Sequence, residues 1–171
     1  RQTVADYQWP NKVKEGREKD IRPCIRCDFC LDGGRRGALT KEVNVKKDST
    51  YDAHCAVNPV HAQGANKLRF IEPNVPQKKV GVIGGGIAGM QGALAAAEQG
   101  HLVTLYEKND VLGGQTNLYG EVIWFKKYIN KLREYFIAQI SKNTNITILL
   151  NTEATAKMIE KEEYDALIVA V

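Results

Sequence analysis

The fold is decided by the stretch Val80-Gly-Val-Ile-Gly-Gly-Gly-Ile-Ala-Gly89, in which an apolar run enters a glycine-rich turn and a second apolar segment follows. The run over residues 79–84 predicts a short buried strand, and the alanine-rich residues 87–99 predict a helix. Apolar and β-branched residues predict another strand over 102–107. Because a strand, a helix and a strand follow one another, the sequence predicts an α/β fold with a Rossmann-like parallel sheet.

Three glycines of this turn have the spacing G-x-G-x-x-G between a strand and a helix, the context that makes this short motif specific. Gly84 permits a tight turn, Gly86 lets the backbone approach a pyrophosphate, and Gly89 lets helix and strand pack closely. The start of the helix favours an anion, because its N–H groups are unpaired. We therefore expect Gly84, Gly85, Gly86 and Gly89 to bind a dinucleotide. The alternative is an α/β core without a nucleotide.

Two features after the second strand refine the expected ligand. Glu107 ends that strand, and a carboxylate there accepts hydrogen bonds from ribose hydroxyls and repels a 2′-phosphate, which argues against NADP at this site. Lys108 follows Glu107. Further along the chain, a second glycine pair, Gly113-Gly114, precedes Gln115. A second glycine pair near the pyrophosphate favours FAD over NAD, with a plain loop as the alternative. We expect Glu107, Lys108, Gly114 and Gln115 to be cofactor-binding residues.

The rest of this half has a simpler pattern. Residues 109–120 are rich in turn-formers, residues 122–141 have the apolar spacing of a helix with one buried face, and residues 146–150 and 166–171 predict two more strands. Since the chain stops inside the last apolar run and begins without a strand, we expect further sequence on both sides.

Four cysteines occupy the first third of the chain, at Cys24, Cys27, Cys30 and Cys55. The first three have two residues between each pair, and a backbone looping at this spacing can wrap three sulfurs around one corner of a cube. This is the spacing of the ferredoxin run, which a more distant cysteine completes. The pattern predicts that these four cysteines bind a [4Fe–4S] cluster.

Other interpretations of the cysteines stay open. Zinc sites with four thiolates usually use two separated Cys-x2-Cys pairs, whereas here three cysteines crowd together and one stands alone. A redox disulfide is a further alternative. His54 and His61 lie near the fourth cysteine, either as substitute ligands or as ordinary loop residues.

Composition narrows the class of protein. The 171 residues are 43% hydrophobic and 26% charged, as in a globular protein, and the net charge of +4 is too small and too dispersed to predict nucleic-acid binding. No apolar run has the length of a membrane span. Because the cysteines cluster as in a metal site, we expect a cytoplasmic protein, where thiols stay reduced. We expect three parts: 1–20, the cysteine segment 21–77, and the Rossmann-like part 78–171.

The order of these motifs resembles the NADH:flavin oxidoreductases of the 2,4-dienoyl-CoA reductase, 2-enoate reductase and trimethylamine dehydrogenase group. The resemblance covers essentially the whole chain. It is carried by Arg1-Gln-Thr-Val-Ala-Asp6, Trp9–Asp20, Arg22-Pro-Cys-Ile-Arg-Cys27, Cys55-Ala-Val-Asn-Pro59, Val80–Gly89, Glu107-Lys108, Leu112–Gln115 and Tyr164–Val171.

This resemblance implies that residues 1–20 are the C-terminal end of an FMN-binding TIM barrel. Residues 1–6 would be the end of its last strand, where Arg1 contacts the FMN phosphate, and 9–20 its final helix. It also implies a reaction: electrons pass from NAD(P)H through FAD and the [4Fe–4S] cluster to FMN, which reduces an activated C=C bond of an enoate or enoyl-CoA. The resemblance implies that the substrate pocket lies outside this chain, so we name no catalytic residue.

Two other functions remain as alternatives. In a trimethylamine-dehydrogenase-like enzyme, the Rossmann-like part would bind ADP as a structural ligand. The chain would otherwise be a zinc-stabilised nucleotide-binding module without redox chemistry. The sequence also departs from the family between Cys30 and Cys55, where residues 33–46 look inserted, either as a partner or substrate contact or as a surface excursion.

Overall fold

The computed structural model describes residues 2–31, 55–59, 61, 76–122 and 127–171. The chain divides into two compact units, Arg1–Phe70 and Ile71–Val171. The first unit holds all four cysteines, and the second holds the expected Rossmann-like part.

The second unit is built on a four-stranded sheet. Its strands are β1 (Lys79–Ile83), β2 (Leu102–Tyr106), β3 (Ile146–Leu149) and β4 (Ala166–Val169), in the order β3-β2-β1-β4. Every neighbouring pair is parallel. This confirms the α/β class and the parallel sheet. Because all strands run in one direction, the loops that follow them meet at one edge of the sheet.

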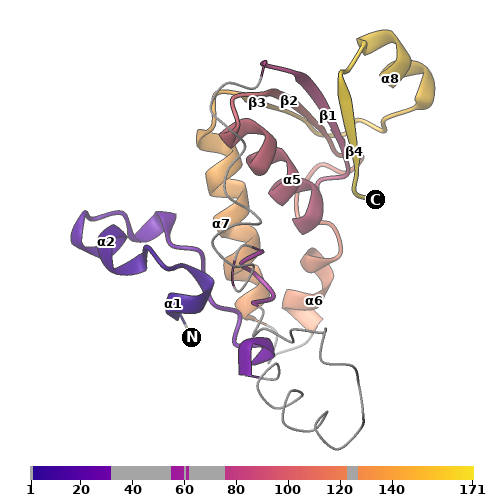
Figure 1. Ribbon diagram of the computed structural model, residues 1–171. Helices are drawn as coiled ribbons and strands as arrows, with labels where there is room; N and C mark the ends of the chain where they lie inside the picture. Colours follow the sequence, from indigo (N-terminus) through magenta and orange to yellow (C-terminus); the bar gives the residue numbers. More distant parts are fainter. Residues whose placement is uncertain (1, 32–54, 60, 62–75, 123–126) are drawn as a thin grey trace, which may run out of the picture. The chain divides into compact units, whose positions relative to one another are not determined.

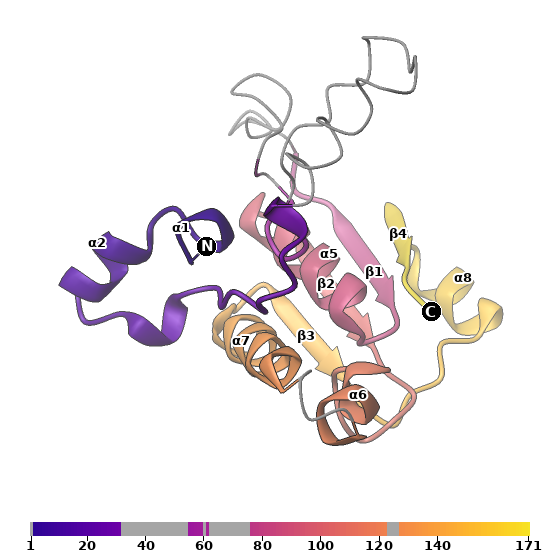
Figure 2. The same cartoon turned by 90° about the horizontal axis from the view of Figure 1, so that it is seen from below.

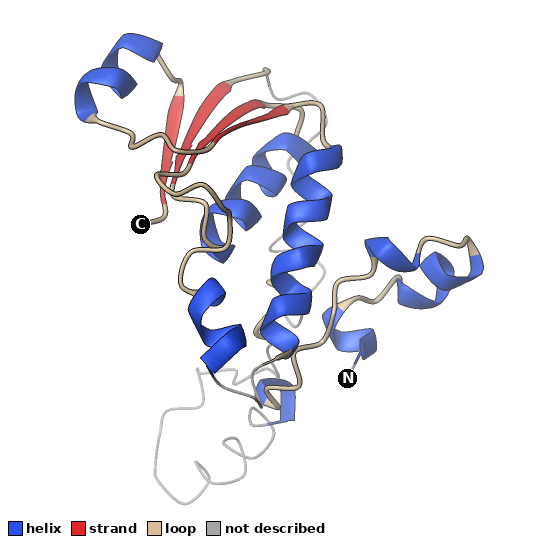
Figure 3. Ribbon diagram, turned by 180° about the vertical axis from the view of Figure 1, so that it is seen from behind, coloured by secondary structure: helices blue, strands red, loops and turns tan. Residues whose placement is uncertain are grey.

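Two long helices cover one face of this sheet, as Figure 1 and Figure 3 show. They are α5 (Ile87–Glu98) and α7 (Tyr128–Lys142), which also pack against each other. The largest fully buried side chains come from both layers: Val82, Met90, Leu105, Phe136 and Ile140. Burial of these apolar side chains between helices and sheet stabilises the unit.

The structure differs from the predicted elements in two places. The stretch 116–122, expected to consist mostly of turns, forms α6 (Thr116–Val122). The helix expected over 122–141 begins at Tyr128 as α7, and residues 123–126 lie outside the described part. A further helix, α8 (Ala156–Glu162), is not among the predicted elements. It buries only Ile159, so its sequence has no clear apolar period. Figure 2 shows α8 beside β4, away from α5 and α7.

The first unit begins with three short helical segments: α1 (Gln2–Ala5), α2 (Trp9–Lys14) and the 3-10 turn Glu18–Asp20. The expectation that residues 1–6 end a barrel strand is therefore wrong for residues 2–5, where the Asp6 N–H closes a helical turn on the Gln2 carbonyl at 2.9 Å. Arg1 lies outside the described residues. In the described ranges of both units, no helix combines the length and apolar character needed to cross a bilayer.

Candidate functional site

The turn between β1 and α5 has the geometry expected of its glycines. Gly84 has a left-handed φ of +103°, and a Cβ there would lie 2.5 Å from the Ala170 carbonyl oxygen. A Cβ on Gly89 would lie 1.8 Å from the Gly84 carbonyl oxygen, so only glycine permits this packing of helix on turn. A Cβ on Gly86 would meet no atom within 4 Å, which means that the backbone there borders open space.

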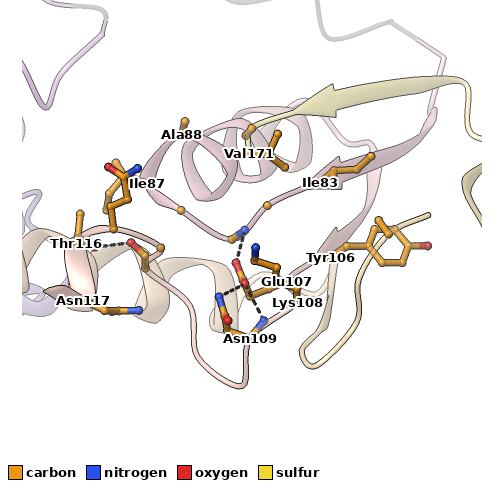
Figure 4. A pocket seen from close by; sticks show the side chains of 18 of the residues that line it. Ile83, Ile87, Ala88, Tyr106, Glu107, Lys108, Asn109, Thr116, Asn117 and Val171 are labelled. Carbon is orange, nitrogen blue, oxygen red and sulfur yellow. Dashed lines mark hydrogen bonds between the residues drawn. The ribbon is translucent and has the colours of Figure 1, made fainter. Parts of the chain in front are cut away.

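Glu107 is buried at the end of β2, and both of its carboxylate oxygens accept hydrogen bonds (Figure 4). Its Oε2 accepts from the Gly85 N–H at 2.8 Å. Its Oε1 accepts from the backbone N–H and the Nδ2 of Asn109, each at 2.8 Å. The carboxylate therefore ties the glycine turn to the loop after β2 and is held in place before any ligand arrives.

Asn109 has a role that its sequence context does not reveal. Besides its two bonds to Glu107, its carbonyl oxygen accepts from the Asn151 N–H at 2.9 Å, which joins the loops after β2 and β3. The only sequence signal is that asparagine side chains often bond to groups two residues away. That tendency is local and common, and it does not indicate which carboxylate will be held.

The second glycine pair lies directly against the first turn. The Gly113 N–H donates to the Gly85 carbonyl at 2.9 Å, and Gly113 pairs with Gly86 in a short parallel bridge. Both glycines of the pair have positive φ, +120° and +52°. A Cβ on Gly114 would lie 3.1 Å from the Gly86 Cα. The two glycine turns thus form one continuous backbone surface.

A cavity of about 900 Å³ opens over this surface. That volume lies within the range of small-molecule and cofactor sites. Its walls come from the glycine turn, the end of β2, the second glycine pair with the start of α6, and the loop after β3. Among the residues predicted to bind a cofactor, those that line the cavity are Gly84, Gly85, Gly86, Glu107, Lys108, Gly114 and Gln115.

Tyr106 lines the same cavity, and its hydroxyl lies 2.7 Å from the hydroxyl of Tyr164, which precedes β4. Burial and then this hydrogen bond raise the pKa of Tyr106 well above the ordinary tyrosine value. The hydroxyl is therefore neutral throughout the physiological range. Tyr106 presents this wall of the cavity as an uncharged surface.

The cysteine run of the first unit has an unusual backbone. Arg26 and Asp28, on either side of Cys27, both have left-handed φ angles, 54° and 59°, which non-glycine residues seldom adopt. The Arg26 N–H donates to the Cys24 sulfur at 3.4 Å. All four cysteines are free thiols in the structure. Thiols in a tightly looped backbone with N–H groups directed at sulfur have the donor chemistry that an iron–sulfur cluster requires.

A hydrogen-bond network joins the segments that carry Cys24 and Cys55. Arg22 donates from Nη1 to the Val57 carbonyl at 2.6 Å, and Asn58 donates from Nδ2 to the Val4 carbonyl at 2.9 Å. Gln2 accepts from the Cys24 N–H at 3.1 Å and donates to the Arg22 carbonyl at 2.7 Å. These bonds bring the backbone after Cys55 to the backbone before Cys24.

The structure does not bring the predicted metal ligands into one coordination site. Over the described ranges, no three side chains of His, Cys, Asp or Glu lie together as a metal-binding group. That Cys24, Cys27, Cys30 and Cys55 converge on one cluster therefore stays a prediction. His54 and the apparent insertion at 33–46 lie outside the described residues, while His61 is described and half-buried.

Comparisons with known proteins match both units. The family model described as "FAD dependent oxidoreductase" matches residues 79–170. NADH oxidase of Thermoanaerobacter brockii is 35% identical over 98% of the chain, and cinnamate reductase of Clostridium sporogenes is 35% identical over 99%. The chain spans 24% and 23% of the length of these two relatives.

A solved structure of 2-naphthoyl-CoA reductase with 2-naphthoyl-CoA is also similar. It superimposes with a TM-score of 0.82 at 33% identity, covering 99% of this chain and 24% of that one. These three matches each cover at least 98% of this chain, so they include both the cysteine segment and the glycine turns. The chain therefore belongs to the FAD dependent oxidoreductases, in the NADH:flavin oxidoreductase group that the order of its motifs resembles.

Proposed function

We propose that this chain is the electron-relay part of an NAD(P)H-dependent flavin oxidoreductase that reduces an activated C=C bond of an enoate or enoyl-CoA. The observation that carries the proposal is the cavity over two joined glycine turns, with a buried carboxylate at its rim, in a chain that also holds four free thiols. The similarity to cinnamate reductase and 2-naphthoyl-CoA reductase supports the substrate class.

Three walls of the cavity suit parts of FAD. The N–H groups at the start of α5 and the open backbone at Gly86 suit the pyrophosphate. Glu107 keeps acceptor capacity for ribose hydroxyls, since each carboxylate oxygen can accept more than one hydrogen bond. Gly114 and Gln115 extend the surface toward the flavin half.

In the first unit, Cys24, Cys27, Cys30 and Cys55 would hold a [4Fe–4S] cluster, which when bound supplies one-electron transfer between flavins. The contribution of the chain is to position the thiols. The Gln2 side chain fixes the backbone on either side of Pro23, because it donates to the Arg22 carbonyl and accepts from the Cys24 N–H. The Arg22 side chain donates to the Val57 carbonyl after the last cysteine. Residues 1–20 would end the FMN barrel.

The test is a cofactor analysis of the intact protein, prepared anaerobically. We expect FAD and FMN in the supernatant of denatured protein, about four irons with matching acid-labile sulfide, and loss of flavin absorbance on adding NADH. Release of ADP in place of FAD, without bleaching by NADH, would favour the trimethylamine-dehydrogenase-like alternative. A colourless protein with one zinc would rule out the redox function.

A further inference from the structure

An arginine on α7 holds an asparagine at the wall of the cavity. Arg133 Nη1 donates a 2.7 Å hydrogen bond to Asn117 Oδ1, and Asn117 lines the cavity beside the second glycine pair. α6, which carries Asn117, packs against α7. Figure 4 shows Asn117 and Thr116 on the side of the cavity opposite to Tyr106. Neither Asn117 nor Arg133 is among the cofactor-binding residues predicted from the motifs.

The contact fixes which way the amide of Asn117 is turned. A guanidinium group has only donors, so the amide oxygen must face Arg133. The amide nitrogen, with its two N–H donors, is then the group that Asn117 can offer to a ligand. The pair thus converts an amide that could present either end into a fixed hydrogen-bond donor.

Gly113 shows how closely the pair is built into the glycine surface. A Cβ at Gly113 would lie 2.5 Å from Asn117 Oδ1 and 2.6 Å from Arg133 Cδ. The space that a side chain would need at Gly113 is therefore filled by the arginine and the asparagine. Position 113 is therefore restricted to glycine for two reasons: its neighbours leave no space for a side chain, and its φ of +120° is left-handed.

The amide lies near the backbone that should face a pyrophosphate. A Cβ on Gly113 would lie 2.5 Å from the amide oxygen of Asn117, and Gly113 pairs with Gly86, the residue that borders open space. The backbone N–H of Asn117 donates to the Gly114 carbonyl at 3.1 Å. Among the cavity-lining residues that the structure describes, Glu107 and Glu153 are acidic and Lys108 is the one cation. A doubly charged pyrophosphate in this setting gains from a second cation, and Arg133 provides it from behind the amide.

We propose that Asn117 is a ligand-binding residue that donates through Nδ2 to the pyrophosphate of the bound dinucleotide, and that Arg133 is the positioning residue that orients it. The inference rests on the proposed function, since it requires a dinucleotide in this cavity. It adds a side-chain donor to a site that otherwise binds phosphate through backbone N–H groups.

The decisive variant is Asn117→Asp in the intact protein. The carboxylate keeps an acceptor for Arg133, so the folded state is retained, but an oxygen replaces the donor that faces the pyrophosphate. After removal of bound flavin, titrations with FAD and with ADP should each show affinity lowered about 10- to 100-fold, as for loss of a hydrogen bond to a charged group. Affinity for adenosine should not change. Asn11→Asp, on exposed α2, adds the same charge outside the cavity and is the matched control.

Two variants of the arginine test the positioning role. Arg133→Met lets the amide rotate, and we expect FAD and ADP affinity to fall about 3- to 10-fold, a loss comparable to one neutral hydrogen bond. Arg133→Lys should restore most of it, because an ammonium group is also only a donor. Lys131→Met removes an exposed charge from the same helix and should leave affinity unchanged.

The outcomes separate this inference from the proposed function. If the unsubstituted protein binds neither FAD nor ADP, both fail. If it binds them and Asn117→Asp binds them equally well with an unchanged thermal midpoint, only this inference fails. A loss confined to FAD would also overturn it, because ADP carries both phosphates. Equal effects of Arg133→Met and Arg133→Lys would show that the arginine does not act through the amide.

Discussion

Each of the two units of the chain is stabilised internally by a different kind of interaction. We call Arg1–Phe70 the cysteine unit and Ile71–Val171 the dinucleotide unit. In the described part of the cysteine unit, the buried hydrophobic residues are only Ala5 and Val57, and Asp6 and Asn58 are buried beside them. Side-chain to backbone hydrogen bonds from Gln2, Arg22 and Asn58 join its segments. In the dinucleotide unit, the segments are joined by a parallel ladder of four strands and by an apolar layer under α5 and α7.

The difference indicates where each unit obtains its stability. Apolar burial scales with the area removed from water, so the dinucleotide unit has a core that is independent of ligand. Hydrogen bonds contribute little net free energy each, so the cysteine unit needs a further source. Metal binding that is coupled to folding is such a source in small, core-poor segments. We therefore expect changes in the first unit to act on metal content, and changes in the second to act on folding or ligand affinity.

The largest expected effect is that of Cys55→Ser. If Cys55 is the fourth ligand, serine should abolish the visible absorbance and reduce iron and acid-labile sulfide to near zero in anaerobic preparations. Flavin content should be retained, because the dinucleotide unit has its own core. His61→Ala tests whether His61 is a ligand in place of Cys55. We expect this control variant to keep its visible absorbance. Unchanged iron in Cys55→Ser would mean that this cysteine is not a ligand.

Next in size is Gly89→Ala, which tests the close packing of α5 on the turn. The added Cβ would lie 1.8 Å from the Gly84 carbonyl oxygen, so backbone must move. We expect destabilisation of about 3 kcal/mol or more, as for overpacking in a core, measured by denaturant unfolding of the dinucleotide unit. Gly92→Ala, in the same helix, is the control: its Cβ would lie 3.3 Å from two methyl groups of Ile168 and far from any backbone clash, so the variant should be nearly neutral or stabilising. Equal stability of both variants would contradict the packing argument.

A smaller effect is expected from Asn109→Ala, which removes one of the three N–H donors that hold Glu107. The backbone N–H of residue 109 remains, so the carboxylate should be less well held rather than displaced. We expect FAD affinity to fall about 3- to 10-fold, the loss of one hydrogen bond, in fluorescence titrations. Asn11→Ala should have no effect. An unchanged affinity in Asn109→Ala would show that Glu107 does not depend on this donor.

The smallest expected effect is a pH dependence of the cysteine unit. Burial alone would raise the pKa of Asp6, but hydrogen bonds from Lys12, Arg22 and Gln8 hold it below the ordinary value of 3.8. Because the folded pKa is depressed, the stabilisation is present above pH 3.8 and is lost as the pH falls through the folded pKa.

The measurement is the thermal midpoint between neutral pH and about pH 3, compared for the unsubstituted protein and Asp6→Asn. The difference between the two should be largest at neutral pH and should shrink in acid. Asp110→Asn, at an exposed carboxylate of the other unit, should show no such convergence. A constant difference across the range would contradict the role of the charged Asp6.

The sequence predicted the second unit well because its signals are local and periodic. Strands β1 and β2 and helix α5 begin at the expected residues, and the glycine turn has the expected geometry. Helix α8 escaped prediction because it buries a single side chain, and α6 because its residues read as turn-formers. Helix α1 replaced an expected strand end, since four residues carry too little pattern to decide.

The sequence by itself determined the parallel sheet, the two glycine turns and the cysteine spacing, because residue type and interval along the chain are enough for each of these. Only the tertiary structure decided that Asn109 holds Glu107, that Arg133 orients Asn117, and that Arg22 joins the backbone near Cys24 to that after Cys55. The last two contacts join segments well separated in sequence. In all three contacts the packing of the backbone sets the partner, because polar side chains of common types have many potential partners until the fold selects one.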